Sequence, residues 1–286
     1  MTSPAPTAAA MTPVRVFPDD AALGSALAAE VMAGVRAARR DGRRYLLGCP
    51  GGRSARTTYQ ALAELARGED MGTLVIVMMD EYLEPAPGGG FRHVSPDAPH
   101  SCRRFAEQEI RGPIDAVAAT PVPADHVWLP DPADVDAYEP RIEAAGGVDL
   151  FIVASGASDG HVAFMPPGSS LDGGVAIVPL AETTRRDNMA TFPTFRSLDE
   201  VPIHGVSVGL GTIARQSRTV RLIMLGEDKR ASAARVAAAS GFDPAWPATV
   251  IHACRDAAIW LDSAARGGRE EEPSGGPRGA RTEEVT

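Results

Sequence analysis

Strand-length apolar segments alternate with amphipathic segments of helical length along most of this chain. The apolar segments are 44–49, 73–80, 126–129, 148–156, 205–210, 220–226 and 256–261. Most are apolar almost without interruption, as strands covered on both faces are. Segments with helical periodicity lie next to or between several of them, for example 21–40 and 55–68. This order predicts an α/β fold, with one three-layer α/β/α domain built around a mostly parallel, Rossmann-like sheet.

The chain ends differ in composition from the segment between them. Residues 1–13 are small and proline-rich, and residues 263–286 are charged and rich in glycine and proline. Such segments cannot bury enough apolar surface to order themselves, so both are expected to be disordered tails. The α/β domain is therefore expected to span 14–262.

Charge and cysteine content exclude several classes of protein. The 286 residues carry a net charge of −9, so no overall positive field would attract nucleic acid or an anionic membrane, and neither is an expected partner. Cys49, Cys102 and Cys254 lie far apart, which excludes a disulfide scaffold and a cysteine-rich zinc site. With no secretion signal or long apolar run, we expect a cytoplasmic protein. No histidine and aspartate spacing suggests a metal site, and no metal or cofactor is expected.

Ligands of open parallel sheets bind beyond the carboxyl ends of the strands, so the residues that follow each apolar segment are the candidates. After 44–49 come Gly51, Gly52, Arg53 and Ser54, followed by a helical pattern. Backbone N–H groups at such a turn can hold an anion, and the Ser54 hydroxyl adds a donor. The alternative is an ordinary tight turn between a strand and a helix.

Two other strand ends carry candidate acid–base groups. Asp80 follows a buried segment, where partial desolvation would raise its pKa and suit it to act as a general base. Asp159 and His161 flank a glycine after 148–156, so the carboxylate could orient the imidazole. The alternatives are that Asp80 fixes the following loop and that His161 is structural.

Two cations complete the set of candidates. Of the 28 basic residues only Lys229 is a lysine, and it lies in the first turn of an expected helix, where the helix dipole disfavours a cation. A bound phosphate would compensate, with Arg185 as a second contact. Alternatively, Lys229 is solvated and pairs with Glu227 or Asp228.

These segments together resemble the glucosamine-6-phosphate deaminase (isomerase) family, within the superfamily that includes 6-phosphogluconolactonases. The matching segments, between about Tyr45 and Leu261, are PGGRSARTTYQAL, MMDEYLEP, SDGHVAFMPPGSSL, TTRRDN, VSVGLGTI and LGEDKRASA. The resemblance implies a phosphorylated sugar as small-molecule partner, and homo-oligomers occur often in the family. By that resemblance Asp80 moves a proton between C1 and C2 of the opened sugar, His161 assists ring opening and Asp159 orients it. The residues expected to bind phosphate are Ser54, Arg185 and Lys229.

The sequence departs from the family pattern at two places. The family usually reads DGHIAFNEPGSSL, so its asparagine and catalytic glutamate fall on Met165 and Pro166. A missing acid–base partner typically costs about 10²–10⁴-fold in rate. Three nearby carboxylates could substitute for the glutamate: Glu81, Glu84 and Asp172. Arg53 stands where the family usually has glycine, which would either admit a more acidic substrate or narrow the pocket.

Three functions remain open from the sequence. The first is a sugar-phosphate isomerase or deaminase that acts by abstracting the C2 proton of a hexose or amino-sugar phosphate. The second is a lactone hydrolase like the 6-phosphogluconolactonases, which share the Asp-Gly-His loop without the glutamate. The third is a sugar-phosphate-binding protein without catalytic activity.

Overall fold

A seven-stranded parallel sheet forms the centre of the protein, in the order β1-β11-β10-β7-β2-β3-β6. The computed structural model describes residues 11–267. The strands of this sheet are β1 (Val14–Phe17), β2 (Tyr45–Cys49), β3 (Leu74–Met78), β6 (Val127–Trp128), β7 (Val148–Ala154), β10 (Ser217–Met224) and β11 (Ala257–Asp262). Every residue of β2 and β3 is buried, which confirms strands covered on both faces.

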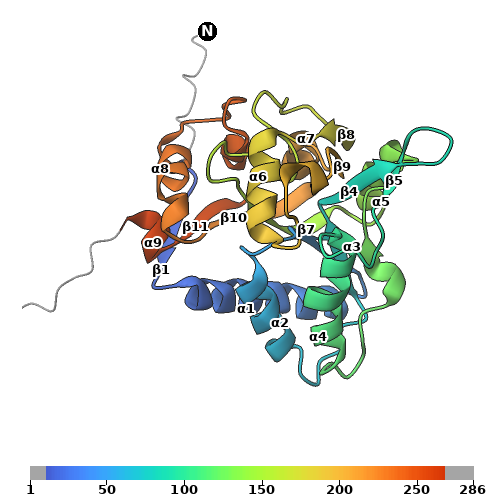
Figure 1. Ribbon diagram of the computed structural model, residues 1–286. Helices are drawn as coiled ribbons and strands as arrows, with labels where there is room; N and C mark the ends of the chain where they lie inside the picture. The colour runs from blue at the N-terminus through green and yellow to red at the C-terminus, as the bar shows by residue number, and fades with distance from the viewer. Residues whose placement is uncertain (1–10, 268–286) are drawn as a thin grey trace, which may run out of the picture.

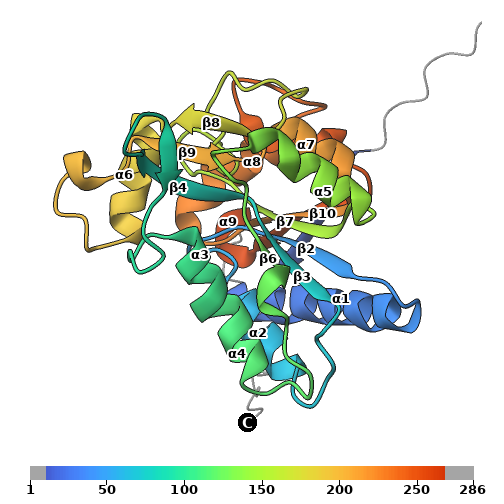
Figure 2. The ribbon, with the colours of Figure 1, turned by 90° about the vertical axis from the view of Figure 1, so that its right-hand side faces the viewer.

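Helices cover both faces of this sheet, so the three-layer α/β/α fold is confirmed (Figure 2). In that view α1, α2 and α4 lie below the sheet, while α5 and α7 lie above it. The helices are α1 (Asp20–Arg40), α2 (Arg56–Leu65), α3 (Cys102–Phe105), α4 (Gly112–Asp115), α5 (Tyr138–Ala144), α6 (Glu182–Thr191), α7 (Leu210–Gln216), α8 (Arg230–Ala238) and α9 (Ser263–Arg266). A π-helical segment, Ala106–Arg111, joins α3 to α4.

The long helix α1 is fixed at its start and along one face. The Asp19 carboxylate accepts a hydrogen bond of 2.7 Å from the Ala22 N–H, which satisfies a free donor of the first turn. Leu27, Val31 and Val35 recur at helical spacing on its buried face. The helix is long and apolar enough to cross a membrane by length and composition alone, but this face packs in the core of the protein.

A second, four-stranded antiparallel sheet has the order β5-β4-β9-β8 (Figure 1). Its strands are β4 (Asp80–Pro85), β5 (Phe91–His93), β8 (Ala176–Pro179) and β9 (His204–Ser207). Segment 205–210 was expected in the parallel sheet. That expectation was wrong, because β9 pairs antiparallel with β4 and β8. The chain leaves β3 at Met78 and enters the second sheet at Asp80, so this carboxylate lies at the junction of the two sheets.

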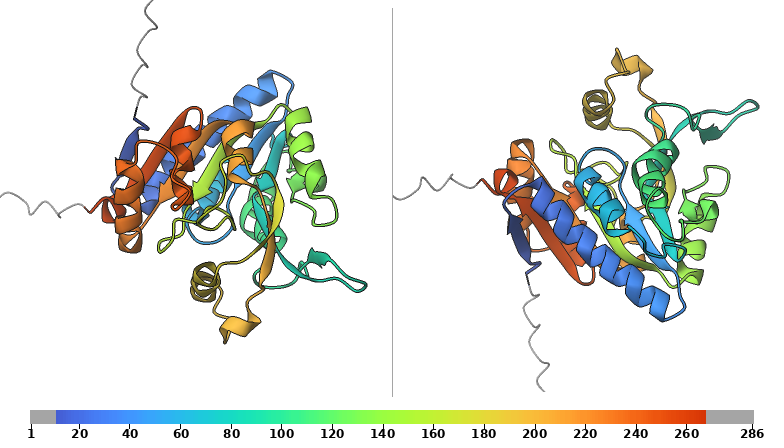
Figure 3. Two further views of the ribbon diagram at one scale, coloured as in Figure 1. Left: turned by 90° about the horizontal axis from the view of Figure 1, so that it is seen from above. Right: turned by 90° about the horizontal axis from the view of Figure 1, so that it is seen from below.

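The chain between β8 and β9 forms α6 and the loop after it. Both views of Figure 3 show this segment projecting from the main body of the protein. The ordered region also extends past the expected boundary at 262: Asp262 caps α9, accepting a 2.7 Å hydrogen bond from the Ala265 N–H. Residues 263–267 therefore do not belong to a disordered tail. The expected tails otherwise lie almost entirely outside the described residues.

Candidate active site

The carboxyl ends of four parallel strands surround a cavity of about 450 Å³. The residues that line it after these strands are Pro50 to Ser54 after β2, Met79 and Asp80 after β3, Ser155 to Ala157 after β7, and Leu225 and Gly226 after β10. Helix α6 also contributes lining residues, among them Thr184, Asp187 and Thr191. A site at this edge is what the parallel sheet predicts.

Asp80 is a buried carboxylate that lines the cavity. It is 6% exposed, and its Oδ1 accepts a hydrogen bond from the Cys102 thiol at 3.2 Å. Burial raises the pKa of Asp80 to about 7, with the Glu81 charge acting in the same direction and the Cys102 hydrogen bond and His161 opposing it. A carboxyl group with this pKa exchanges protons readily near neutral pH, as a general base must.

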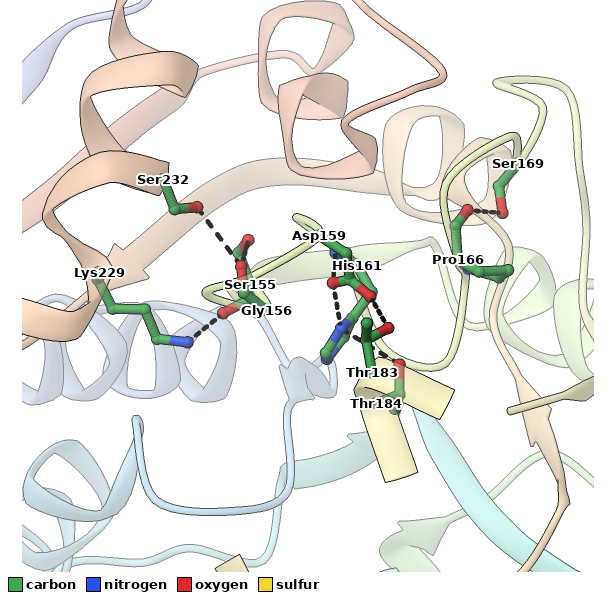
Figure 4. Close-up of polar contacts among 10 residues, drawn as sticks. All are labelled: Ser155, Gly156, Asp159, His161, Pro166, Ser169, Thr183, Thr184, Lys229 and Ser232. Atoms are coloured by element: carbon green, nitrogen blue, oxygen red, sulfur yellow. Dashed lines mark hydrogen bonds and ion pairs between the residues drawn. The ribbon is translucent and has the colours of Figure 1, made fainter. Parts of the chain in front are cut away.

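His161 lies in the same cavity and is held by Asp159 (Figure 4). Asp159 Oδ1 lies 2.7 Å from His161 Nδ1, and Oδ2 accepts a hydrogen bond from the Thr183 hydroxyl of α6. Burial alone would raise the pKa of Asp159. The hydrogen bonds and the charge of His161 outweigh this effect, so the pKa of Asp159 is lowered. The ionised carboxylate fixes the tautomer with the proton on Nδ1, which leaves Nε2 to contact a ligand.

Lys229 and Arg53 supply positive charge to the cavity. Lys229 Nζ donates a 2.7 Å hydrogen bond to the Ser155 carbonyl, and Figure 4 shows the side chain extended toward that group. Burial lowers the pKa of Lys229, while Asp228 and Asp187 raise it and Arg53 lowers it. Among residues 11–267, neither cation forms an ion pair within 4.0 Å. Two cations without an ionic partner favour an anionic ligand.

The Arg53 and Ser54 side chains belong to the turn between β2 and α2 that lines the cavity. Gly52 adopts φ +83°, a left-handed conformation that glycine adopts without strain. Gly51 and Gly52 also line the cavity. The structure thus brings this turn, Lys229, Asp80 and His161 around one space.

Arg185 is the expected phosphate contact that does not reach the cavity. Its guanidinium donates to the backbone carbonyls of Leu198 and Val201, the latter at 3.1 Å, and it does not line the cavity. Arg185 therefore fastens α6 to the loop that follows it. In this arrangement Arg53, and not Arg185, is the arginine beside Lys229.

None of the carboxylates considered as substitutes for the missing glutamate lines the cavity. The Glu81 carboxylate is buried and accepts hydrogen bonds from the backbone N–H groups of Tyr82, Cys102 and Arg103 and from the Ser101 hydroxyl. Glu84 forms a 3.0 Å ion pair with Arg92 outside the cavity. Asp172 is exposed on another loop.

Pro166 does not line the cavity either, and its carbonyl accepts a hydrogen bond from the Ser169 hydroxyl (Figure 4). Asp187, which sequence reasoning missed, does line it from α6, and the described residues include no hydrogen-bond or ion-pair partner for its carboxylate. Its position within TTRRDN gave no sign of this, because the side of the helix that faces the cavity depends on how α6 packs.

Known proteins resemble this chain over most of its length. The family model described as glucosamine-6-phosphate isomerases/6-phosphogluconolactonase matches residues 18–260. The chain belongs to this family. Glucosamine-6-phosphate deaminase of Mycolicibacterium smegmatis is 33% identical over 258 residues, covering 88% of this chain and 90% of the relative. The Bifidobacterium longum subsp. infantis deaminase is also 33% identical, over 231 residues, covering 77% of this chain and 80% of the relative.

Solved structures share the fold. A monomeric glucosamine-6-phosphate deaminase superposes with a TM-score of 0.75 at 22% identity, covering 90% of this chain and all of that one. The 6-phosphogluconolactonase of Trypanosoma brucei gives a TM-score of 0.65 at 18% identity, covering 90% of this chain and 99% of that one. The family is thus established. Its description names both glucosamine-6-phosphate isomerases and 6-phosphogluconolactonase, so family membership does not decide between isomerisation and lactone hydrolysis.

Proposed function

We propose that the protein is a sugar-phosphate enzyme that interconverts an aldose phosphate and a ketose phosphate by moving a proton between C1 and C2. The observation that carries this proposal is the shared cavity, in which a buried carboxyl group with a pKa of about 7 lies together with a histidine and two cations that have no ionic partner in the described chain. The cytoplasm is the expected location.

The ligand's phosphate would bind beside Lys229, Arg53 and Ser54. A dianion there gains charge-assisted hydrogen bonds from the two cations, which are shorter and about twice as strong as neutral ones. Backbone N–H groups of the Gly51–Gly52 turn would add further donors. The phosphate would thereby fix the position of the sugar relative to the acid–base groups.

Asp80 and His161 would then carry the chemistry. His161, with Nδ1 held by Asp159, presents Nε2 to the sugar, takes the proton of the anomeric hydroxyl and passes it to the ring oxygen, which opens the ring. Ionised Asp80 abstracts the C2 proton of the open sugar and returns it at C1, while His161 Nε2 takes the proton of the O2 hydroxyl and delivers it to O1, so that no proton is gained or lost overall. Because this exchange uses only these groups, it does not depend on the acid that Pro166 replaces.

Ammonia release requires more than this exchange. An amino-sugar substrate must have its amine converted to a leaving group, and the family's usual glutamate is absent at Pro166. Asp187 is the carboxylate on α6 that could supply such an acid, since it lines the cavity without a side-chain partner among residues 11–267. Because isomerisation does not need this acid, we propose isomerisation and not deamination as the main reaction.

Solvent deuterium exchange tests the proposal. The protein is incubated in D₂O with glucose 6-phosphate, fructose 6-phosphate or glucosamine 6-phosphate, and deuterium at C2 or C1 is followed by NMR. We expect incorporation with at least one of these, and a loss of about 10²–10⁴-fold in Asp80→Asn. Asp172→Asn, at an exposed residue that does not line the cavity, is the matched control. Binding of all three without exchange would refute proton abstraction and leave either lactone hydrolysis or sugar-phosphate binding without catalysis.

Lactone hydrolysis is the second candidate. It is favoured by one observation: the His161–Asp159 pair is intact while the acid at Pro166 is missing. In that reaction His161 would deprotonate a water that attacks the lactone carbonyl. Loss of 6-phosphogluconolactone faster than the spontaneous reaction, abolished by His161→Gln but retained in Asp80→Asn, would support hydrolysis over isomerisation.

A further inference from the structure

The Cys102 thiol is the hydrogen-bond donor that contacts the side chain of Asp80. Its Sγ lies 3.2 Å from Asp80 Oδ1, and no other hydrogen bond to this carboxylate occurs among residues 11–267. Cys102 is 6% exposed and lines the same cavity. We propose that Cys102 is a positioning residue that fixes the orientation of the Asp80 carboxylate for proton transfer. This inference rests on the proposed function of Asp80.

The local structure holds Cys102 in place from its backbone. The buried Glu81 carboxylate, next to Asp80 on β4, accepts a 2.8 Å hydrogen bond from the Cys102 N–H and 2.9 Å bonds from the Ser101 hydroxyl and the Arg103 N–H. Four buried or half-buried groups thus join the start of α3 to the strand that carries Asp80. Because the backbone of Cys102 cannot shift freely, its thiol is held against the carboxylate.

The thiol also lies near the turn that lines the phosphate end of the proposed site. A Cβ at Gly51 would lie 3.8 Å from Cys102 Sγ, ordinary van der Waals contact. Cys102 is therefore close to both Asp80 and the glycine turn. A hydroxyl in place of the thiol would keep a donor toward Asp80, whereas a methyl group would remove it.

The other charged and titratable groups near Asp80 come from several elements. These are Glu81 on β4, His161 after β7, and the hydroxyls of Tyr59 on α2, Tyr82 on β4 and Tyr138 on α5. None of them donates a hydrogen bond to the Asp80 carboxylate in the described chain. Removing the thiol would leave Oδ1 as well as Oδ2 without a donor, so the carboxylate could rotate away from the reacting carbon.

Kinetics of Cys102→Ala and Cys102→Ser test this role. A hydrogen bond to a charged group is stronger than a neutral one, but a thiol is a weak donor, so we expect Cys102→Ala to lower kcat roughly ten-fold with little change in KM. The acid limb of kcat/KM should move to higher pH, because the lost bond stabilised the ionised carboxylate. Cys102→Ser should recover kcat and move the limb back. Cys254→Ala, whose thiol donates to the Val250 carbonyl outside the cavity, is the control.

A second measurement does not depend on activity. The S–H stretching band of Cys102, isolated as the infrared difference between wild type and Cys102→Ala, should shift in Asp80→Asn and on titration of Asp80. An unshifted band, or a Cys102→Ala enzyme with unchanged kcat and pH profile, would overturn the positioning role. If wild type exchanges no sugar phosphate while the band still responds to Asp80, the proposed reaction fails and the hydrogen bond stands.

Discussion

Replacing Asp80 by asparagine should remove the catalytic base and at the same time stabilise the free protein at alkaline pH. The buried carboxyl group has a pKa of about 7 in the folded protein against 3.8 for an unperturbed aspartate. Ionising it in the folded state is therefore unfavourable. Asparagine has nearly the same shape and keeps an oxygen that can accept the hydrogen bond of the Cys102 thiol, but it carries no charge.

The magnitude follows from this pKa difference. Between pH 4 and 7 the carboxyl group of Asp80 is protonated in the folded state but ionised in the unfolded state. The stability that the protonated form of Asp80 gives to the folded protein, relative to the ionised form, is therefore fully present below pH 4. It is lost as pH rises through 7. Each pKa unit corresponds to about 1.4 kcal/mol, so ionised Asp80 lowers the free energy of unfolding by up to about 4 kcal/mol above pH 7. Activity and stability should thus change in opposite directions, as they often do at active sites.

Urea unfolding of wild type and Asp80→Asn at pH 5, 6, 7 and 8 measures this contribution. Other groups titrate in both proteins, so the difference between them isolates Asp80. We expect the difference to grow in favour of asparagine by roughly 1 kcal/mol per pH unit up to pH 7, and then to level off. Asp172→Asn, exposed and outside the cavity, should show no such trend. A difference independent of pH would refute the assignment of a raised pKa to Asp80.

Three further predictions follow from the cavity. Lys229→Ala should raise KM for a sugar phosphate by about ten- to a hundred-fold, because it removes a charge-assisted contact of about 1.5–3 kcal/mol. Arg185→Ala, which removes a guanidinium that binds backbone carbonyls, should lower thermal stability and change KM far less. Steady-state kinetics and thermal melting distinguish the two variants. Asp159→Asn should lower kcat by at least ten-fold, because the amide cannot stabilise a charged imidazole. Stopped-flow measurement should show that the loss occurs at ring opening. An unchanged rate of ring opening would contradict the role of the Asp159–His161 pair. Pro166→Glu should leave aldose–ketose exchange intact without creating strong ammonia release, because residue 166 does not line the cavity. A coupled assay of ammonia release from glucosamine 6-phosphate checks this. A large gain in ammonia release would show that the loop turns inward when ligand is bound.

The sequence predicted the parallel sheet and the edge at which the cavity lies, because buried strands and the glycine turn leave strong local patterns. It misassigned β9 (His204–Ser207), whose apolar run looks the same whether it pairs in a parallel or an antiparallel sheet. The direction of Arg185 could not be predicted either. Neighbouring residues on a helix point about 100° apart, so the packing of α6 decides that Asp187 and not Arg185 faces the cavity.

Cys102 shows a second limit of sequence reasoning. It lies 22 residues after Asp80 in a segment without a clear pattern, and its thiol reaches the carboxylate only because Glu81 binds the start of α3. No spacing rule signals such a contact. The departures at Arg53 and Pro166, in contrast, were visible in the sequence, although only the structure shows that Arg53 lines the cavity and Pro166 does not.

The most direct measurement is a crystal structure of the Asp80→Asn protein with glucose 6-phosphate or fructose 6-phosphate bound. We expect the phosphate within hydrogen-bond distance of Lys229 Nζ, the Arg53 guanidinium and the Ser54 hydroxyl, with C2 of the sugar beside residue 80 and the ring oxygen beside His161 Nε2. A phosphate bound elsewhere, or a sugar whose C1 and C2 lie away from residue 80, would contradict the proposed reaction.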